Sequence, residues 1–472
     1  MVRKTKIICT IGPATKREDT IISLIKNGMN VARLNFSHGD YSEHEELINN
    51  IRSAAETVGK EIPIIGDLGG PKVRVGELAD DIMLIQGEIV LVSYERIHNI
   101  NHKNLPVNYE RFARDVKVGD RVLIDDGLIK LKIIKIEDDR IFCEVIDGGR
   151  VSSRKGVNLP DSTLSIECLT AKDRDDIEFA LDQKLDFLAL SFVRNSSDIE
   201  KLRSYLSTKS SPLPIIAKIE KPEAIRDIEN IIKTSDMIMI ARGDLGVEMS
   251  PYEVPILQKE IIRKCLFFKK PVITATQMLE SMIHNPRSTR AEASDIANAL
   301  FDGTDAVMLS GETSIGQYPE AAVKTMHSIL LRAEKTDYIF SPLFNGEQYL
   351  ENSQFAINLS RAACWIAKET RSTAILAMTK TGRTARLLSG YRTATPIIAF
   401  SPHKSTVTAL KLNWGVESVL IDSFSNTDEN LAQAKEYALQ KGVVKKGDTI
   451  LYIVGDPIEE TEEINMIKIE KV

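Results

Sequence analysis

Charged and hydroxyl side chains stand where several short apolar runs of this sequence end. Lys218 and Glu220 close one run, and Arg33 and Asn35 close another. Because residues two apart on a strand share a face, the two members of each pair point the same way. The residues at or just after such ends that could do chemistry are Arg33, Asn35, Ser37, His38, Asp67, Lys218, Glu220, Asp244, Thr276, Ser310 and Glu312.

These residue types suit a phosphoryl group held beside a divalent metal. The carboxylates of Glu220 and Asp244 are oxygen ligands of the kind that Mg²⁺ or Mn²⁺ prefers. The cations Lys218 and Arg33 suit a phosphate or phosphoryl group, and Thr276 with a glycine backbone could hold a carboxylate. The combination predicts a site for phosphoryl transfer, where positioning and charge neutralisation supply most of the catalysis.

The elements that carry these residues are short apolar runs alternating with helical patterns. Most runs are followed by an amphipathic segment, such as Arg17–Asn27 or Asp173–Gln183. Eight buried parallel strands alternating with helices describe an α/β fold, the (β/α)8 TIM barrel, whose active site lies at the C-terminal strand ends. The eight expected strands are Lys6–Gly12, Met29–Phe36, Pro63–Asp67, Asp186–Val193, Pro214–Glu220, Asp236–Arg242, Val272–Gln277 and Asp305–Gly311.

The interval between the third and fourth expected strands is too long for one crossover. Glycine and Asp-Gly turns there separate β-rich runs, which predict a small all-β domain inserted into a barrel loop. Since it leaves from the C-terminal side of a strand, it can act as a lid over the barrel mouth. Its expected strands are Glu88–Val92, Arg121–Ile124, Leu128–Ile136 and Ile141–Ile146.

A third α/β unit follows the barrel, after a linker expected at Tyr338–Gln348. We therefore expect a barrel domain of residues 1–70 and 163–340, an inserted β lid domain of residues 71–162, and a C-terminal α/β regulatory domain of residues 341–472. The strands expected in the last unit are Thr373–Met378, Pro396–Phe400, Val416–Ile421 and Thr449–Val454.

The alternative is that the charged strand ends are structural ion pairs, Lys218 with Glu220 and Arg242 with Asp244. For one pair alone, a structural ion pair and an active-site pair would be equally good interpretations. Charged residues at the ends of six strands of one barrel favour an active site, because that face carries the catalysis in such folds.

Composition narrows the class of partner. The chain of 472 residues has a formal net charge of −6, so it has no global attraction to nucleic acid or to anionic lipid. No stretch reaches the eighteen apolar residues of a membrane span. The five cysteines form no Cys-x-x-Cys pair, and their odd number favours a reducing, cytoplasmic location over a disulfide framework.

Several long motifs, in the same order, resemble those of the pyruvate kinase family. The resemblance covers essentially the whole chain, including the inserted domain and the C-terminal unit. It implies the fold given above, a transfer of the phosphoryl group of phosphoenolpyruvate to ADP, and a homotetramer. The motifs that carry it are Met29–Gly39, Ile215–Ile225, Ala241–Gly246, Thr276–Met282, Ser288–Asp295 and Met308–Thr313.

The resemblance also implies a role for each matching residue. Lys218 and Arg33 would contact the phosphoryl group, and Glu220 and Asp244 would hold the divalent metal. Gly243, with Asp244 and Thr276, would bind the substrate carboxylate. The candidates for protonating enolpyruvate are Thr276, Ser310 and Glu312. The residues expected to serve the nucleotide are Asn35, Ser37, His38, Arg74 and Lys155.

One run departs from the potassium-dependent members of the family. Those members resemble Asp-Thr-Lys-Gly-Pro-Glu after the third strand, where this chain has Leu68 in place of a hydroxyl ligand and Lys72 in place of a carboxylate. The ammonium of Lys72 could occupy the monovalent-cation site, whose other members would be Asn35, Ser37 and Asp67. We therefore expect no need for K⁺. The alternative is that Lys72 faces solvent.

A second candidate site lies in the C-terminal unit. A strand runs into Thr379, Lys380, Thr381, Gly382, Arg383 and Thr384, and a helix follows. Backbone N–H groups at a helix start, hydroxyls and two cations make a phosphate cradle. The family uses this place for allosteric effectors, which implies a phosphorylated effector, a sugar phosphate or a nucleotide monophosphate. The alternative is an ordinary turn with hydroxyl caps.

Two other functions remain open at this point. A metal-dependent aldolase or lyase acting on a pyruvate-like enolate would use the same charges, without evident need for a lid or a third domain. A metabolite sensor with a decayed site is opposed by the intact set Lys218, Glu220, Asp244 and Thr276.

Overall fold

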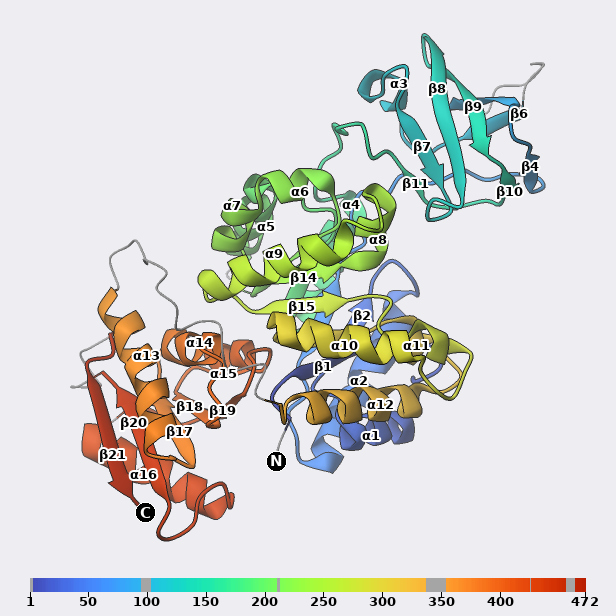
Figure 1. Ribbon diagram of the computed structural model, residues 1–472. Coiled ribbons are helices and arrows are strands. Elements are labelled where there is room, and N and C mark those ends of the chain that lie inside the picture. Colours follow the sequence, from blue (N-terminus) through green and yellow to red (C-terminus); the bar gives the residue numbers. More distant parts are fainter. Residues whose placement is uncertain (1–2, 95–102, 210–212, 337–353, 425, 456–462) are drawn as a thin grey trace.

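The fold is α/β, with a closed barrel of eight parallel strands, an inserted β domain and a C-terminal α/β domain (Figure 1). The computed structural model describes residues 3–94, 103–209, 213–336, 354–424, 426–455 and 463–472. All eight barrel strands expected from the sequence are present. They are β1 (Lys6–Thr10), β2 (Val31–Asn35), β3 (Ile64–Asp67), β12 (Phe187–Leu190), β13 (Ile215–Ile219), β14 (Met237–Ala241), β15 (Val272–Ala275) and β16 (Ala306–Leu309).

Helices between the strands form the outer layer of the barrel (Figure 1). Local signals set their ends: Asp40 and Glu43 form a capping box at the start of α2, and left-handed Gly59 follows its last turn. The helices of this layer are α1 (Glu18–Asn27), α2 (Tyr41–Val58), α4 (Ala171–Asp182), α5 (Ser196–Thr208), α6 (Pro222–Arg226), α7 (Ile228–Thr234), α8 (Arg242–Glu248), α9 (Val254–Phe267), α10 (Arg290–Asp302), α11 (Gly311–Ser314) and α12 (Pro319–Ala333), with a 3-10 turn at Glu280–Ile283.

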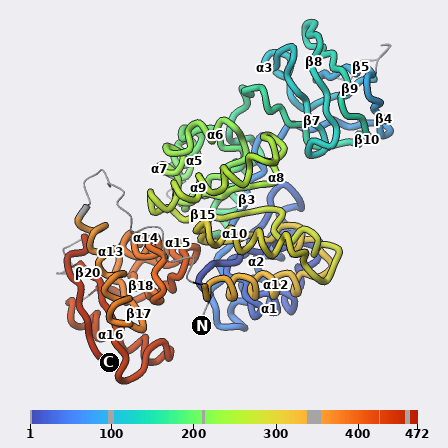
Figure 2. Tube along the Cα trace, viewed as in Figure 1, coloured from blue at the N-terminus to red at the C-terminus, as the bar shows by residue number. Residues whose placement is uncertain are grey.

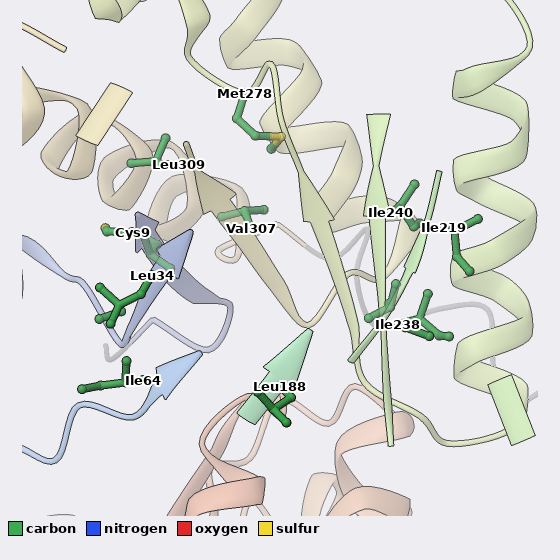
Figure 3. Packing of buried hydrophobic residues seen from close by; sticks show 14 of the residues in the cluster. Cys9, Leu34, Ile64, Leu188, Ile219, Ile238, Ile240, Met278, Val307 and Leu309 are labelled. Atoms are coloured by element: carbon green, nitrogen blue, oxygen red, sulfur yellow. The ribbon is translucent and has the colours of Figure 1, made fainter. Parts of the chain in front are cut away.

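Each barrel strand divides its side chains between two cores. Residues such as Leu34, Ile64 and Leu188 point outward and pack against the helices (Figure 3). Their neighbours, such as Ile65 and Phe187, belong to a separate buried cluster inside the barrel. The strict alternation means that the polar side chains near the strand ends either fill the barrel mouth or disturb the helix packing.

The insertion has a hydrophobic core of its own and lies at the opposite end of the molecule from the C-terminal domain (Figure 2). The four strands expected here are present, but the sequence missed four short ones: β4, β6, β10 and β11. The elements are β4 (Ile82–Leu84), β5 (Ile89–Ser93), β6 (Lys103–Pro106), α3 (Phe112–Asp115), β7 (Arg121–Ile124), β8 (Ile129–Glu137), β9 (Arg140–Asp147), β10 (Gly149–Val151) and β11 (Val157–Asn158).

The C-terminal domain is a five-stranded sheet in the order β19-β18-β17-β20-β21. Its four expected strands are parallel neighbours, and the antiparallel edge strand β21 was not expected. The linker expected at Tyr338–Gln348 lies outside the described residues. The elements are α13 (Gln354–Glu369), β17 (Ala374–Met378), α14 (Arg383–Gly390), β18 (Ile397–Ser401), α15 (Lys404–Leu410), β19 (Val416–Leu420), α16 (Thr427–Gln440), β20 (Thr449–Val454) and β21 (Met466–Lys471).

Among the described residues, no helix is both long enough and apolar enough to cross a bilayer.

Candidate active site

Lys218 is the centre of a buried charge cluster in the barrel mouth. It lies one residue before the end of β13, with its Nζ 2.9 Å from Glu220 Oε1 and 3.2 Å from Asp67 Oδ1. The same ammonium donates a 2.7 Å hydrogen bond to Ser191 Oγ. Burial alone would lower the pKa of Lys218, but the charges of Asp67 and Glu220 outweigh it and raise that pKa. The ammonium therefore remains protonated.

Arg33 completes this cluster from β2. Its Nε lies 2.6 Å from Asp67 Oδ2, and its Nη1 donates a 3.0 Å hydrogen bond to Thr10 Oγ1. Burial would raise the pKa of Asp67, yet the cations Lys218 and Arg33 together lower it. The cluster thus holds two fixed cations, and its inner carboxylate stays ionised.

Glu220 and Asp244 are the carboxylates available to a divalent metal. Glu220 Oε2 accepts a 2.8 Å hydrogen bond from the backbone N–H of Phe192. Burial raises the pKa of Glu220. The charge of Lys218 works against this rise, and the charge of Asp244 adds to it. No group of three or more potential side-chain ligands forms in the described part of the chain. Two carboxylates nevertheless fit Mg²⁺, which is commonly bound by one or two carboxylates and completed by substrate oxygens and water.

Thr276 follows β15 in a conformation that most residues avoid. Its φ is 68°, and that of Gln277 is 54°. The guanidinium of Arg242 stabilises the turn, because its Nη2 donates a 2.8 Å hydrogen bond to Thr276 O. Its Nη1 lies 2.7 Å from Asp295 Oδ2. The hydroxyl of Thr276 accepts a 2.7 Å hydrogen bond from the N–H of Gly243. Strain held by surrounding contacts in this way is typical of functional sites.

The ion-pair alternative is wrong for Arg242. This residue pairs with Asp295 and not with Asp244. The reason is that β14 ends at Ala241 and Arg242 starts α8, so the two-residue period of a strand does not apply to positions 242 and 244. Lys218 and Glu220 do form an ion pair, but one that includes Asp67 and sits at the barrel mouth.

Ser310 and Glu312 follow β16. Glu312 is fully buried, and its two carboxylate oxygens accept hydrogen bonds from the N–H groups of Ser310 (2.7 Å) and Leu279 (2.9 Å). The hydroxyl of Ser310 is buried and has no hydrogen-bond partner among the described residues. Glu312 therefore fixes the backbone here, and Ser310 offers the unengaged hydroxyl.

The residues expected to serve the nucleotide are only partly brought together. Asn35 Oδ1 accepts a 3.2 Å hydrogen bond from the N–H of Ser37, next to exposed His38. Although the side chain of His38 is exposed, partial loss of solvation lowers its pKa, and the charges of nearby Arg74, Arg33 and Lys72 lower it further. Arg74 Nη1 itself donates a 3.3 Å hydrogen bond to Arg154 O in the insertion. Lys155 pairs with Asp125 at 2.9 Å, and both residues belong to the insertion.

Lys72 lies at the root of the insertion, and its side chain is 23% exposed and turned toward Asp244. Its Nζ is 3.2 Å from Asp244 Oδ1 and 5.9 Å from the ring centroid of Phe192. The other expected members of the cation site, Asn35, Ser37 and Asp67, make their contacts elsewhere, while Leu68 packs in the outer barrel core. The ammonium of Lys72 thus neutralises a candidate metal ligand.

The loop from Thr379 to Thr384 lies at the end of β17. Gly382 has a φ of 81° and donates a 2.9 Å hydrogen bond to the hydroxyl of Thr379. All residues of the loop except Gly382 line a small pocket. Glu463 also borders this pocket, with its Oε1 3.8 Å from Arg383 Nη1. The hydroxyl-capped turn of the alternative is therefore present, and it borders a pocket.

Ser191 and Thr10 were missed from the sequence, although both contact the expected site residues. Each occupies an inward-facing position near its strand end, two residues after Ala189 and Ile8, which line the barrel interior. The face rule that selected Lys218 applies to both, but the two expected strands that contain them carry no charged side chain near their C-terminal ends to draw attention to these positions.

Comparison with known proteins identifies the family. A family model of the pyruvate kinase barrel domain matches residues 2–323, and one of the pyruvate kinase alpha/beta domain matches residues 358–470. Pyruvate kinases of Staphylococcus epidermidis and Staphylococcus aureus are each 44% identical over 475 residues, covering 100% of this chain and 81% of the relative. The crystal structure of a pyruvate kinase from Cryptosporidium parvum has a TM-score of 0.93 and 36% identity, covering 99% of this chain and 96% of that one. The chain belongs to the pyruvate kinase family, whose members are phosphotransferases.

Proposed function

We propose that this protein transfers the phosphoryl group of phosphoenolpyruvate to ADP, giving pyruvate and ATP in the last step of glycolysis. The observation that carries the proposal is the Lys218 cluster. It holds a protonated ammonium between two carboxylates at the C-terminal end of the barrel, where such folds do chemistry. The 44% identity to pyruvate kinases, which extends over the whole of this chain, supports the same reaction.

The residues divide the work of this reaction. Lys218 and Arg33 bind the phosphoryl group, and Lys218 stabilises its charge during transfer. The N–H of Gly243 and the hydroxyl of Thr276, which hydrogen-bond each other in this structure, would turn to the substrate carboxylate and hold it next to Asp244. Glu220 and Asp244 hold Mg²⁺ or Mn²⁺, which when bound neutralises charge on the substrate oxygens.

Proton delivery and water exclusion fall to other parts of the chain. The buried hydroxyl of Ser310, which no described residue engages, is suited to relay a proton to enolpyruvate, with Thr276 beside the substrate and Glu312 as the support. Asn35, Ser37, His38, Arg74 and Lys155 bind the nucleotide. Closure of the insertion would bring Lys155 from Asp125 to the phosphates and exclude water.

An assay coupled to lactate dehydrogenase tests the reaction. Pyruvate should form from phosphoenolpyruvate only when ADP is present, whereas a lyase would not need the nucleotide. Lys218→Met should lower turnover by about a hundredfold or more, as expected for loss of a preorganised charge in the transition state. Unchanged turnover in that variant would refute the assigned role.

K⁺ independence is a second part of the proposal. The ammonium of Lys72 supplies a fixed positive charge beside Asp244, and Leu68 offers no side-chain oxygen to a cation. Activity should persist with Na⁺ or tetramethylammonium as the only monovalent cation. Lys72→Glu should abolish that activity and regain it with K⁺, while Lys117→Glu, an exposed lysine of the insertion, should not change it. Strong K⁺ activation of the wild type over a negligible basal rate would contradict the proposal.

The loop Thr379–Thr384 is proposed to bind a phosphorylated allosteric effector. Its hydroxyls and cations border one pocket, and the long Arg383–Glu463 pair (3.8 Å) could yield to a phosphate. Activity is to be measured with a panel of sugar phosphates and AMP. The double variant Thr379→Ala, Arg383→Ala should lose the response to whichever compound activates. An unchanged response in the double variant would contradict the assignment. If no compound changes the activity of the wild type, the loop is an ordinary turn with hydroxyl caps.

Assembly, location and domain limits complete the proposal. Exposed Phe355 and Trp365 on α13, and Tyr252 and Ile256 around the start of α9, offer apolar surfaces for a homotetramer. All five cysteines are free and buried, in keeping with a cytoplasmic protein. The domains are proposed to divide as residues 1–70 with 163–340, 71–162 and 341–472.

A further inference from the structure

A cleft of about 560 Å³ lies between the base of the barrel and the C-terminal domain. The barrel contributes the end of α9 and the segments that precede β13, β14 and β15, and the C-terminal domain contributes residues of α14 and α15. Its volume falls in the range of small-molecule sites. It lies away from the strand ends that carry Lys218.

The charges that line this cleft are unbalanced. Its lysines and arginines are Lys233, Lys269, Lys270, Arg383 and Arg386. Asp236 is the acidic residue of the lining, and its carboxylate already accepts hydrogen bonds from Arg203 Nη2 (3.0 Å) and the N–H of Ile215 (2.9 Å). The lining therefore carries an excess of positive charge that its own carboxylate does not offset.

Lys270 and Arg386 bring this charge from the two domains. Lys270 Nζ donates to Ser235 O at 2.6 Å, and Arg386 Nη2 donates to Thr381 O at 3.0 Å. Neither cation forms an ion pair with a carboxylate of any residue that the structure describes. Burial lowers the pKa of both groups, which means that each holds its charge at a cost in solvation.

We propose that this cleft binds a small phosphate-bearing anion, with its phosphoryl group between Lys270 of the barrel and Arg386 of the C-terminal domain. A guanidinium opposite an ammonium suits a tetrahedral oxyanion, and Phe268 and Met237 give an apolar wall to an organic remainder. The site is distinct from the pocket of loop Thr379–Thr384.

The two pockets lie on either side of the start of α14 and can be separated by their residues. Thr379 and Glu463 border only the loop pocket, whereas Lys270 and Asp236 border only the cleft. A ligand of the cleft would contact both domains and so hold one against the other. The inference does not depend on the reaction proposed for the barrel mouth.

Chemical footprinting of the full-length wild-type protein tests the site. Lysine acylation rates are followed by mass spectrometry, at constant ionic strength, with inorganic phosphate or glycerol 3-phosphate and with glycerol as the uncharged control. Acylation of Lys270 should slow roughly tenfold when the phosphate is at about ten times its dissociation constant, because the free fraction falls as 1/(1 + [L]/Kd). Exposed Lys446 should be unaffected.

Two variants assign the protection. Arg386→Gln should abolish the protection of Lys270, and Thr379→Ala should leave it intact. No protection by either phosphate, equal protection by glycerol, or protection that survives Arg386→Gln would each overturn the proposal. Loss of protection in Thr379→Ala would also overturn it, by assigning the anion to the loop pocket.

Discussion

Inside the barrel mouth, the inward-facing positions nearest the strand ends hold charged and hydroxyl groups in direct contact. Lys218 contacts Asp67, Glu220 and Ser191, three groups from three different strands or their ends. Ser191 in turn donates a 2.7 Å hydrogen bond to Leu68 O, which fixes the direction of its lone pairs. Ser191 is thus a positioning residue for the ammonium of Lys218.

Ser191→Ala should lower kcat about tenfold, because losing one hydrogen bond to a charged group costs roughly 1.5 kcal/mol or more. Steady-state kinetics would measure the change, and KM for phosphoenolpyruvate should move less than kcat. The matched control is Ser235→Ala, which removes another buried serine hydroxyl that bonds a backbone carbonyl, Ile231 O. Equal kinetic losses in both variants would show that Ser191 acts only through stability.

At the residue scale, the sequence predicts a side chain's direction only while the chain stays in a strand. The two-residue period brought Lys218 and Glu220 to one face, and they contact each other at 2.9 Å. It could not predict the direction of Arg242, since the strand ends one residue earlier. Nor could it predict that Lys155 pairs with Asp125, because that contact depends on how the insertion folds.

At the scale of elements, α8 links the insertion to the site. Its first turn carries Asp244, and its last residue, Glu248, is buried. Glu248 Oε1 accepts a 2.7 Å hydrogen bond from Asn158 Nδ2 on β11 and also pairs with Lys221. A movement of the insertion would therefore act on the helix that holds a candidate metal ligand.

Asn158→Ala should weaken the docking of the insertion and raise KM for ADP about tenfold, because the variant leaves a buried carboxylate with one donor fewer. Steady-state kinetics and hydrogen exchange of the β7–β9 sheet would measure this. Arg121→Ala is the control, since its pair with Asp161 is partly exposed and worth about 1 kcal/mol or less. If Asn158→Ala leaves KM for ADP and exchange unchanged, α8 does not couple the insertion to the site.

Element prediction succeeded where apolar runs were buried on both sides. Each of the eight barrel strands is almost wholly buried and flanked by a helix, which gives a strong local signal. The missed strands β4, β10 and β11 have only two or three residues and exist through their pairing partners. Strand β21 alternates charged and apolar residues at a sheet edge, where no second face is buried.

At the scale of the molecule, the C-terminal domain is fastened to the base of the barrel. Leu412 of that domain joins the buried cluster inside the barrel. Beside it, Arg392 Nη1 lies 2.8 Å from Asp305 Oδ1, and both side chains are almost completely buried. The same carboxylate accepts hydrogen bonds from the N–H groups of Trp414 (3.1 Å) and Val272 (3.0 Å). One carboxylate thus ties both domains together.

Asp305→Asn should lower the apparent free energy of unfolding by about 3–5 kcal/mol, since it leaves the guanidinium of Arg392 buried without a counter-charge. Thermal and denaturant unfolding would measure the loss, with Arg17→Ala, which removes an exposed pair with Asp19, as the neutral control. The double variant Asp305→Asn, Arg392→Met should recover much of the stability, because an apolar side chain of similar length removes the unpaired charge. If the double variant were as unstable as the sum of the single ones, the backbone contacts of Asp305 would be what holds the domains together.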